Sequence, residues 1–148
     1  MKPEADTVLS QSAYRLLFEI APSMPAGYGQ GTVSLIAVLN LMAAQEYERG
    51  AEIRAAENGD MRALFGETVD LVRDVVLREK LKEAALSHDT SLRISDLNAE
   101  NEKLRSLLIA LHAHVEELDG EAARQAERVI WTVLKASAAR RLVTLPPM

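Results

Sequence analysis

The sequence predicts an all-α protein in which four long antiparallel helices form a bundle, preceded by a short N-terminal helix. Apolar residues recur at spacings of three, four and seven along most of the chain, which is the period of one helix face. No run of alternating β-branched and polar residues lies between turn dipeptides, as a strand would require. Aromatic residues make up only 4% of the chain, so the core must consist mainly of aliphatic side chains, which suits closely packed helices.

The composition is that of an ordinary globular protein. A chain of 148 residues can bury a hydrophobic core as one domain, and its hydrophobic fraction of 48% argues against disorder. The absence of cysteine excludes disulfides, thiolate metal sites and cysteine nucleophiles. We therefore expect one helical domain over residues 1–148, with loose tails at residues 1–7 and 143–148.

The charge and hydropathy patterns favour a soluble, cytoplasmic protein. A net charge of −5 disfavours nonspecific binding to nucleic acid, which needs positive charge opposite the phosphates. The first ten residues lack the apolar segment of a signal peptide. The longest apolar stretch, residues 33–44, is much shorter than the ~20 residues that cross a bilayer. No membrane partner is expected.

The first helix is predicted over residues 8–21, because its apolar side chains share one face and Pro22 ends the pattern. Residues 22–31 contain two prolines and three glycines, which predicts a long loop. The second helix is predicted over residues 32–58. Its segment 33–42 is almost entirely apolar, and a helix that is apolar on all sides is expected to be buried on all sides.

Residues 58–60, Asn-Gly-Asp, predict a tight turn between two helices. Gly59 can adopt the left-handed conformation that ends a helix, and Asp60 can cap the next one. The following helix is predicted over residues 61–87. A connection this short makes the two helices antiparallel neighbours. The apolar stripe of the second one consists of residues at helical spacing: Met61, Leu64, Phe65, Thr68, Val72, Val75 and Val76.

The last two helices are predicted over residues 92–119 and 121–142, after a polar break at residues 88–91. Within 92–119, leucines recur every seven residues at the d positions of a heptad pattern, namely Leu97, Leu104, Leu111 and Leu118. The a positions, offset by three residues, are Ile94, Asn101, Leu108 and Val115. Such a seam is typical of helices that pack against each other, within one chain or between two chains.

Three polar residues in the first half of this segment favour a contact between chains. A single buried Asn at an a position, here Asn101, pairs with its twin in parallel dimeric coiled coils and fixes their register. Glu100 at g and Arg105 at the following e position have the spacing at which charges pair between partner helices. The predicted interface therefore consists of residues at and beside the seam: Ile94, Leu97, Glu100, Asn101, Leu104 and Arg105.

The second half of the segment has a wider apolar surface, with Leu107 at g and Ile109 at b. A wide stripe is typical of a helix in the core of its own bundle. We therefore assign residues 107–118 to the core of the chain and residues 94–104 to a contact between chains. A basic leucine zipper is disfavoured, because no basic segment precedes the first heptad.

Motifs for catalysis and for metal or cofactor binding are lacking. The glycine-rich segment 22–31 contains neither the Gly-Lys-Ser/Thr of a phosphate-binding loop nor the GxGxxG of a dinucleotide-binding loop. No GxSxG nucleophile motif is present in the sequence. None of the three histidines has a glutamate three residues before it, which excludes the Glu-x-x-His di-iron site of helical bundles. His112 and Glu116 share a helix face but have no identifiable further ligands. We expect no metal and no cofactor.

The leading hypothesis is a non-enzymatic helical-bundle protein that acts through protein–protein contacts and forms a homodimer through its long helices, including residues 92–119. Its partner would be a second copy or another helical protein. A second hypothesis is a small-molecule- or cofactor-binding protein, or an enzyme, with a pocket near the 22–31 loop. A third is nucleic-acid binding through the last helix, since residues 121–148 carry five basic side chains against two acidic ones.

Overall fold

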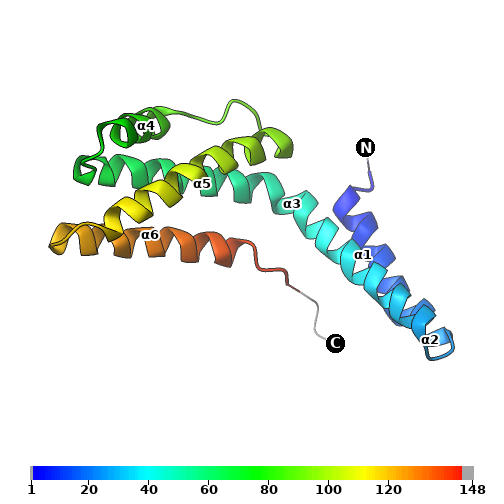
Figure 1. Ribbon diagram of the computed structural model, residues 1–148. Coiled ribbons are helices and arrows are strands. Elements are labelled where there is room, and N and C mark those ends of the chain that lie inside the picture. Colours follow the sequence, from blue (N-terminus) through cyan, green and yellow to red (C-terminus); the bar gives the residue numbers. More distant parts are fainter. Residues whose placement is uncertain (1, 145–148) are drawn as a thin grey trace. The chain divides into compact units, whose positions relative to one another are not determined.

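Residues 2–144 are described by the structure, a computed structural model, and most of them are helical (Figure 1). No strand is present among these residues, which confirms the predicted all-α fold. Within the same part of the chain, no helix combines the length and apolarity needed to cross a membrane. The elements in chain order are α1 (Ala5–Arg15), the π-helical turn η1 (Leu16–Ile20), α2 (Ala21–Ser23), α3 (Tyr28–Thr68), the 3-10 turn η2 (Val69–Leu71), α4 (Val75–Leu86), α5 (Ile94–Glu116) and α6 (Glu121–Arg140).

The chain divides into two compact units. The first contains Met1–Gly50 together with the C-terminal residues from Val143, and we call it the hairpin unit. The second contains Ala51–Leu142, and we call it the bundle unit. The single domain predicted from the sequence, residues 1–148, includes both units. Helix α3 contributes its first half to the hairpin unit and its second half to the bundle unit.

In the hairpin unit, α1 and the first half of α3 lie side by side (Figure 1). Ala13 and Ala37 are fully buried, and Leu41 joins them in a small hydrophobic core. Leu16 and Leu17 of the π-helical turn pack against this core and are partly buried. The two alanine side chains are small, so the two helices can approach each other closely.

The predicted tails are partly structured. Helix α1 begins at Ala5, inside the tail predicted over residues 1–7. At the other end, the Thr144 N–H donates a hydrogen bond to Gln45 Oε1 (3.0 Å), and the Thr144 carbonyl accepts one from Gln45 Nε2 (2.7 Å). Residues 145–148 of the second predicted tail lie outside the described residues.

The loop predicted over residues 22–31 is confined to residues 24–27. Gly27 has a φ of 152°, a backbone conformation that favours glycine and reverses the direction of the chain. Helix α3 then begins at Tyr28 and includes the next two glycines, so the prediction of a long glycine-rich loop is wrong. One glycine is sufficient for the turn, and the others cost helix α3 only a modest amount of propensity, about 1 kcal/mol each.

Segment 33–42 of α3 is not buried on all sides, contrary to the prediction. Ala37 and Leu41 are buried against α1, whereas side chains on the other side of the helix are exposed. The prediction assumed neighbours all round this segment, but α1 covers only one side of it within the hairpin unit. The exposed residues are Leu35, Ile36, Leu39 and Met42.

Helix α3 runs without a break through residues 58–60, so the predicted turn there is wrong. Gly59 costs only about 1 kcal/mol relative to alanine inside a helix, and contacts of its neighbours outweigh that cost. Asn58 is fully buried, and its side-chain amide donates hydrogen bonds to Asp89 Oδ1 (3.0 Å) and to the Leu97 carbonyl (3.3 Å). These contacts stabilise the helical conformation at the point where the sequence favours a stop.

Gly59→Ala is expected to raise the free energy of unfolding by about 0.5–1 kcal/mol. A Cβ atom at Gly59 would have no heavy atom of a neighbouring group within 4 Å, so alanine brings higher helix propensity without a clash. Urea unfolding measures the change. Gly120→Ala is the control, because Gly120 has a φ of 108° and the same substitution should destabilise the protein there. A loss of stability in both variants would contradict a continuous helix at residue 59.

The helix predicted over residues 61–87 is divided in the structure. Helix α3 ends before η2, and α4 begins only at Val75. The Asp74 carboxylate caps α4 by accepting a hydrogen bond from the N–H of its third residue (2.8 Å). The valines in this region also lower helix propensity, because they are β-branched. As a result, Val72 of the predicted stripe is buried, but Val75 and Val76 are exposed.

The core of the bundle unit joins the second half of α3 to α4, α5 and α6. Phe65 of α3, Leu81 of α4 and Ile130 of α6 are fully buried in it. Helices α5 and α6 begin and end within a few residues of their predicted bounds. The seam residues of the second half of the heptad segment lie in this core, as predicted: Leu108, Leu111 and Val115.

Candidate functional site

An exposed apolar surface lies on the outer side of α3 in the hairpin unit. At about 100° per residue in an α-helix, Leu35, Leu39 and Met42 point roughly away from the buried Ala37 and Leu41. Leu35 is 59% exposed and Leu39 is 53% exposed, which is unusual for large aliphatic side chains in a row. We define the apolar surface as the exposed residues of this helix segment: Leu35, Ile36, Leu39 and Met42.

Two aromatic residues of the same unit are also exposed. Tyr14 of α1 and Phe18 of the π-helical turn lie one helical turn apart, and their rings stack with centroids 5.9 Å apart. Phe18 is 56% exposed. We call Tyr14 and Phe18 the aromatic pair. Stacked, exposed rings of this kind carry a large apolar area that water solvates poorly.

Residues 20–45 contain no charged side chain. Exposed helix faces normally carry charges of both signs, which keep proteins soluble and apart. Two hydroxyl groups in this region bond to the backbone of their own helix. The Thr32 hydroxyl donates to the Tyr28 carbonyl (2.9 Å), and the Ser34 hydroxyl donates to the Gln30 carbonyl (3.1 Å). The sequence does contain the signal for this surface, because segment 33–42 is apolar on all sides; burial within the chain was the wrong conclusion.

The six residues predicted to form an interface lie in α5, in the bundle unit. Leu97 and Leu104 are 1% exposed and Asn101 is 6% exposed, so these side chains pack within their own chain. A contact between two chains along this seam stays a prediction. The other three residues of the set keep accessible surface that could serve it: Ile94, Glu100 and Arg105.

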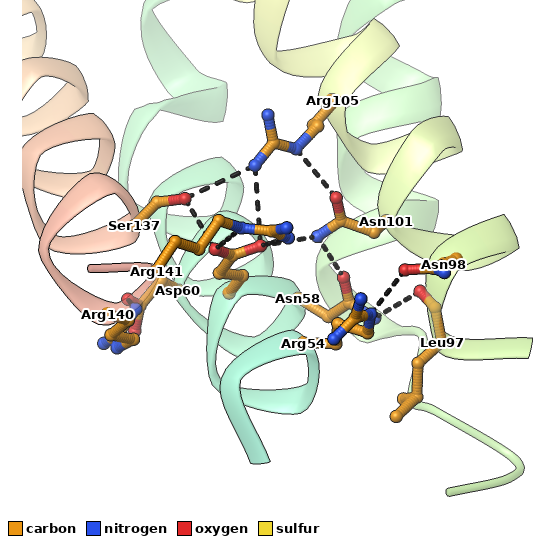
Figure 2. Close-up of polar contacts among 11 residues, drawn as sticks. Arg54, Asn58, Asp60, Leu97, Asn98, Asn101, Arg105, Ser137, Arg140 and Arg141 are labelled. Atoms are coloured by element: carbon orange, nitrogen blue, oxygen red, sulfur yellow. Dashed lines mark hydrogen bonds and ion pairs between the residues drawn. The ribbon is translucent and has the colours of Figure 1, made fainter. Parts of the chain in front are cut away.

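Asn101 has its hydrogen-bond partners inside the chain (Figure 2). Its side-chain amide donates to Asn58 Oδ1 (2.9 Å) and to Glu57 Oε2 (3.3 Å), and its Oδ1 accepts from Arg105 Nε (2.7 Å). The heptad pattern correctly marks Asn101 as a polar residue at a buried seam. Its partners in the structure come from α3 and from the next turn of α5.

Glu57 is the centre of a buried polar cluster that sequence reasoning missed. Its carboxylate accepts hydrogen bonds from Arg141 Nε (2.7 Å), Arg141 Nη2 (2.6 Å) and Ser137 Oγ (2.8 Å). Burial raises the pKa of Glu57, but the hydrogen bonds from Arg141 and Ser137 and the charges of Arg141 and Arg105 outweigh it and hold the pKa at about 2. These partners are more than 40 residues away in the sequence, so no local pattern could reveal them.

The basic residues of the last helix are largely engaged by carboxylates. Arg141 pairs with Glu57, and Arg140 pairs with Asp60 (2.5 Å). Asp60 lies inside α3 and does not cap a helix, contrary to the prediction. Two further arginines of α6 pair with Glu121 in the first turn of that helix. This pairing reduces the positive charge available to phosphates and weakens the hypothesis of nucleic-acid binding through the last helix.

Buried polar side chains of the bundle unit connect its helices through hydrogen bonds. Within residues 2–144, no three His, Asp or Glu side chains lie close enough to hold one metal ion. His112 Nε2 lies 3.5 Å from Glu116 Oε1, in agreement with their spacing on one helix face. The carboxylate of Glu57 is engaged by Arg105 of α5 and by Arg141, which directly follows α6, and this suits a structural role better than proton transfer.

Comparison of the chain with family models, curated proteins and solved structures gave no match. The functional argument therefore starts from the apolar surface and the aromatic pair of the hairpin unit.

Proposed function

We propose that the protein acts through protein–protein contacts between helices and that it forms a homodimer through the apolar surface of the hairpin unit. The observation that supports this proposal is the exposure of four large apolar side chains on a helix segment without charges. Removing such side chains from water is the main favourable term in protein association. The proposal keeps the long-helix dimer expected from the sequence and assigns it to α3 instead of α5.

The exposed area is sufficient for the apolar centre of an ordinary interface. Aromatic side chains bury roughly 150–250 Å² each when they are covered completely, and Leu, Ile and Met side chains bury less. The four side chains of the apolar surface are about half exposed and together offer a few hundred Å² of apolar area; the aromatic pair, on α1 and the π-helical turn, is a separate exposed area. Each partner in a standard interface buries about 800 Å², and a monomeric protein rarely exposes an apolar patch of several hundred Å² without a functional reason.

A second copy of the chain is the partner that best fits this surface. The chain has a net charge of −5, so most contacts between two copies would be opposed by like charges. The uncharged region 20–45 avoids that repulsion. A two-fold symmetric contact needs a patch that complements itself. Leu35, Leu39 and Met42, spaced four and three residues apart, can interdigitate with the same residues of a second helix, as at a coiled-coil seam.

Light scattering coupled to size-exclusion chromatography tests the proposal on the full chain. We expect a mass of twice 16.3 kDa at micromolar concentration. Dilution should produce monomer in a single reversible step, because the contact is symmetric and closed. A strictly monomeric protein at micromolar concentration would reject the proposal.

A further inference from the structure

We infer that the bundle unit contains a binding site for an amphipathic carboxylate, a small molecule with an apolar body and one anionic group at its end. The site is a pocket of about 180 Å³ lined by residues of α3, α5 and α6 and partly open to solvent. This volume is below the roughly 300–1,000 Å³ of sites for drug-sized ligands, so the ligand must be a small molecule. This pocket includes none of residues 22–31, near which the sequence suggested a pocket. The inference is independent of the proposed homodimer, because the pocket belongs to the bundle unit alone.

The walls of the pocket are aliphatic and would accommodate the apolar body of the ligand. Arg105 and His112 line the pocket two turns apart on α5, so its length along this helix is about 10 Å at 1.5 Å per residue. This length suits the short hydrocarbon chain of the proposed ligand. The side chains that form the walls are Met61, Leu108, Ile109, Val133 and Leu134.

Arg105 is well placed to bind the anionic group. Its Nε donates a hydrogen bond to Asn101 Oδ1 (2.7 Å), which orients the guanidinium. Among residues 2–144, its Nη2 makes two contacts, both long, 3.5 Å to Glu57 Oε2 and 3.3 Å to Ser137 Oγ, and the side chain is 48% exposed. An oriented guanidinium with weakly engaged amino groups can bind a carboxylate through two parallel hydrogen bonds.

The charges at this end of the pocket favour an anion over a cation. Glu57 already accepts two shorter hydrogen bonds from Arg141, and Asp60 is paired with Arg140. Among the charged side chains that line the pocket, Arg105 therefore has the most weakly engaged hydrogen-bonding groups. A ligand carboxylate would pair with Arg105, whereas a ligand ammonium group would be repelled by it.

Titration calorimetry with three eight-carbon probes tests the inference on the full chain. Octanoate carries the carboxylate, octylamine has the opposite charge and 1-octanol is uncharged. We expect octanoate to bind about tenfold more tightly than either of the others, because only its head group pairs with Arg105. Equal affinities for octanoate and octylamine, or no binding of octanoate at millimolar concentration, would overturn the inference.

Two variants test the location of the site. Arg105→Gln removes the guanidinium and should weaken octanoate binding about tenfold while 1-octanol binds as before. Since Arg105 also bonds to Asn101, Ile109→Glu serves as a second variant: Ile109 lines the pocket but is 70% exposed, so a carboxylate there spares the core. It should weaken octanoate and favour octylamine. Arg124→Gln, at an exposed arginine of α6, is the control and should bind octanoate like the unchanged protein. Unchanged octanoate binding in both pocket variants would refute the site.

Discussion

Leu39→Glu is expected to convert the proposed homodimer into a monomer. Leu39 is exposed in the middle of the apolar surface, so it would be covered in the dimer. A carboxylate there would lose its water without gaining a partner, because residues 20–45 contain no basic side chain. A penalty of about 3 kcal/mol raises the dissociation constant more than 100-fold. Light scattering over a series of protein concentrations measures this change, and the bundle unit should remain folded because its core lies within one chain.

Two further variants distinguish loss of this interface from a general effect of added charge. Leu86→Glu makes the same change at a leucine of α4 that is 86% exposed in the bundle unit, and it should leave the dimer intact. Ile94→Glu tests the alternative contact along residues 92–119, and it should also leave the dimer intact. A monomeric Ile94→Glu protein together with a dimeric Leu39→Glu protein would move the interface to α5 and refute the proposed one.

Glu57→Ala is expected to lower the free energy of unfolding by about 2–3 kcal/mol. The substitution removes the acceptor shared by Arg141, Ser137 and Arg105 and leaves two arginines without their counter-charge. Both arginines are partly exposed and can regain water, so the loss is smaller than for a fully buried pair. Glu121→Ala is the matched control, because Glu121 also pairs with two arginines but lies on the surface, where ion pairs contribute little. Equal losses in the two variants would contradict a stabilising role for the buried cluster.

The same carboxylate makes stability depend on pH in the acid range. The pKa of Glu57 is about 2 in the folded chain, against an ordinary value of 4.5. Because the folded state binds the proton less readily than the unfolded state, the stabilisation is complete above pH 4.5 and declines as the pH falls toward 2. The difference in unfolding free energy between the unchanged protein and Glu57→Ala should therefore shrink over this interval in urea titrations. A constant difference across it would show that the ionisation of Glu57 does not stabilise the fold.

The helical class and the bounds of α5 and α6 could be predicted, because both helices carry a regular apolar period and a glycine, Gly120, lies between them. The continuous helix through residues 58–60 and the break before Asp74 could not be predicted from the sequence. At Gly59, the low helix propensity of glycine favours a break in the helix by about 1 kcal/mol. Contacts of the neighbouring residues with distant parts of the chain favour a continuous helix, and a local sequence pattern does not reveal those contacts. Near Asp74, valines at helical spacing are equally compatible with one helix or with two.

The candidate sites were predictable to different degrees. Segment 33–42 is apolar in the sequence, and the pattern alone could not distinguish burial in the chain from burial against a partner. Asn101 stands out as the polar residue of a heptad seam, but the seam does not specify which helix faces it. Glu57 lies in an ordinary charged stretch and acquires its role only when Arg141, 84 residues later, folds against it.

The small core of the hairpin unit links its folding to the abundance of the protein. Ala13, Ala37 and Leu41 bury little apolar area, so in the proposed dimer much of the stabilisation of this unit comes from a second copy. Folding and association of the hairpin are then a single equilibrium governed by mass action. The fraction of chains with an ordered hairpin would follow the rate at which the cell makes the protein, whereas the bundle unit, whose core is complete within one chain, would fold at any level of synthesis.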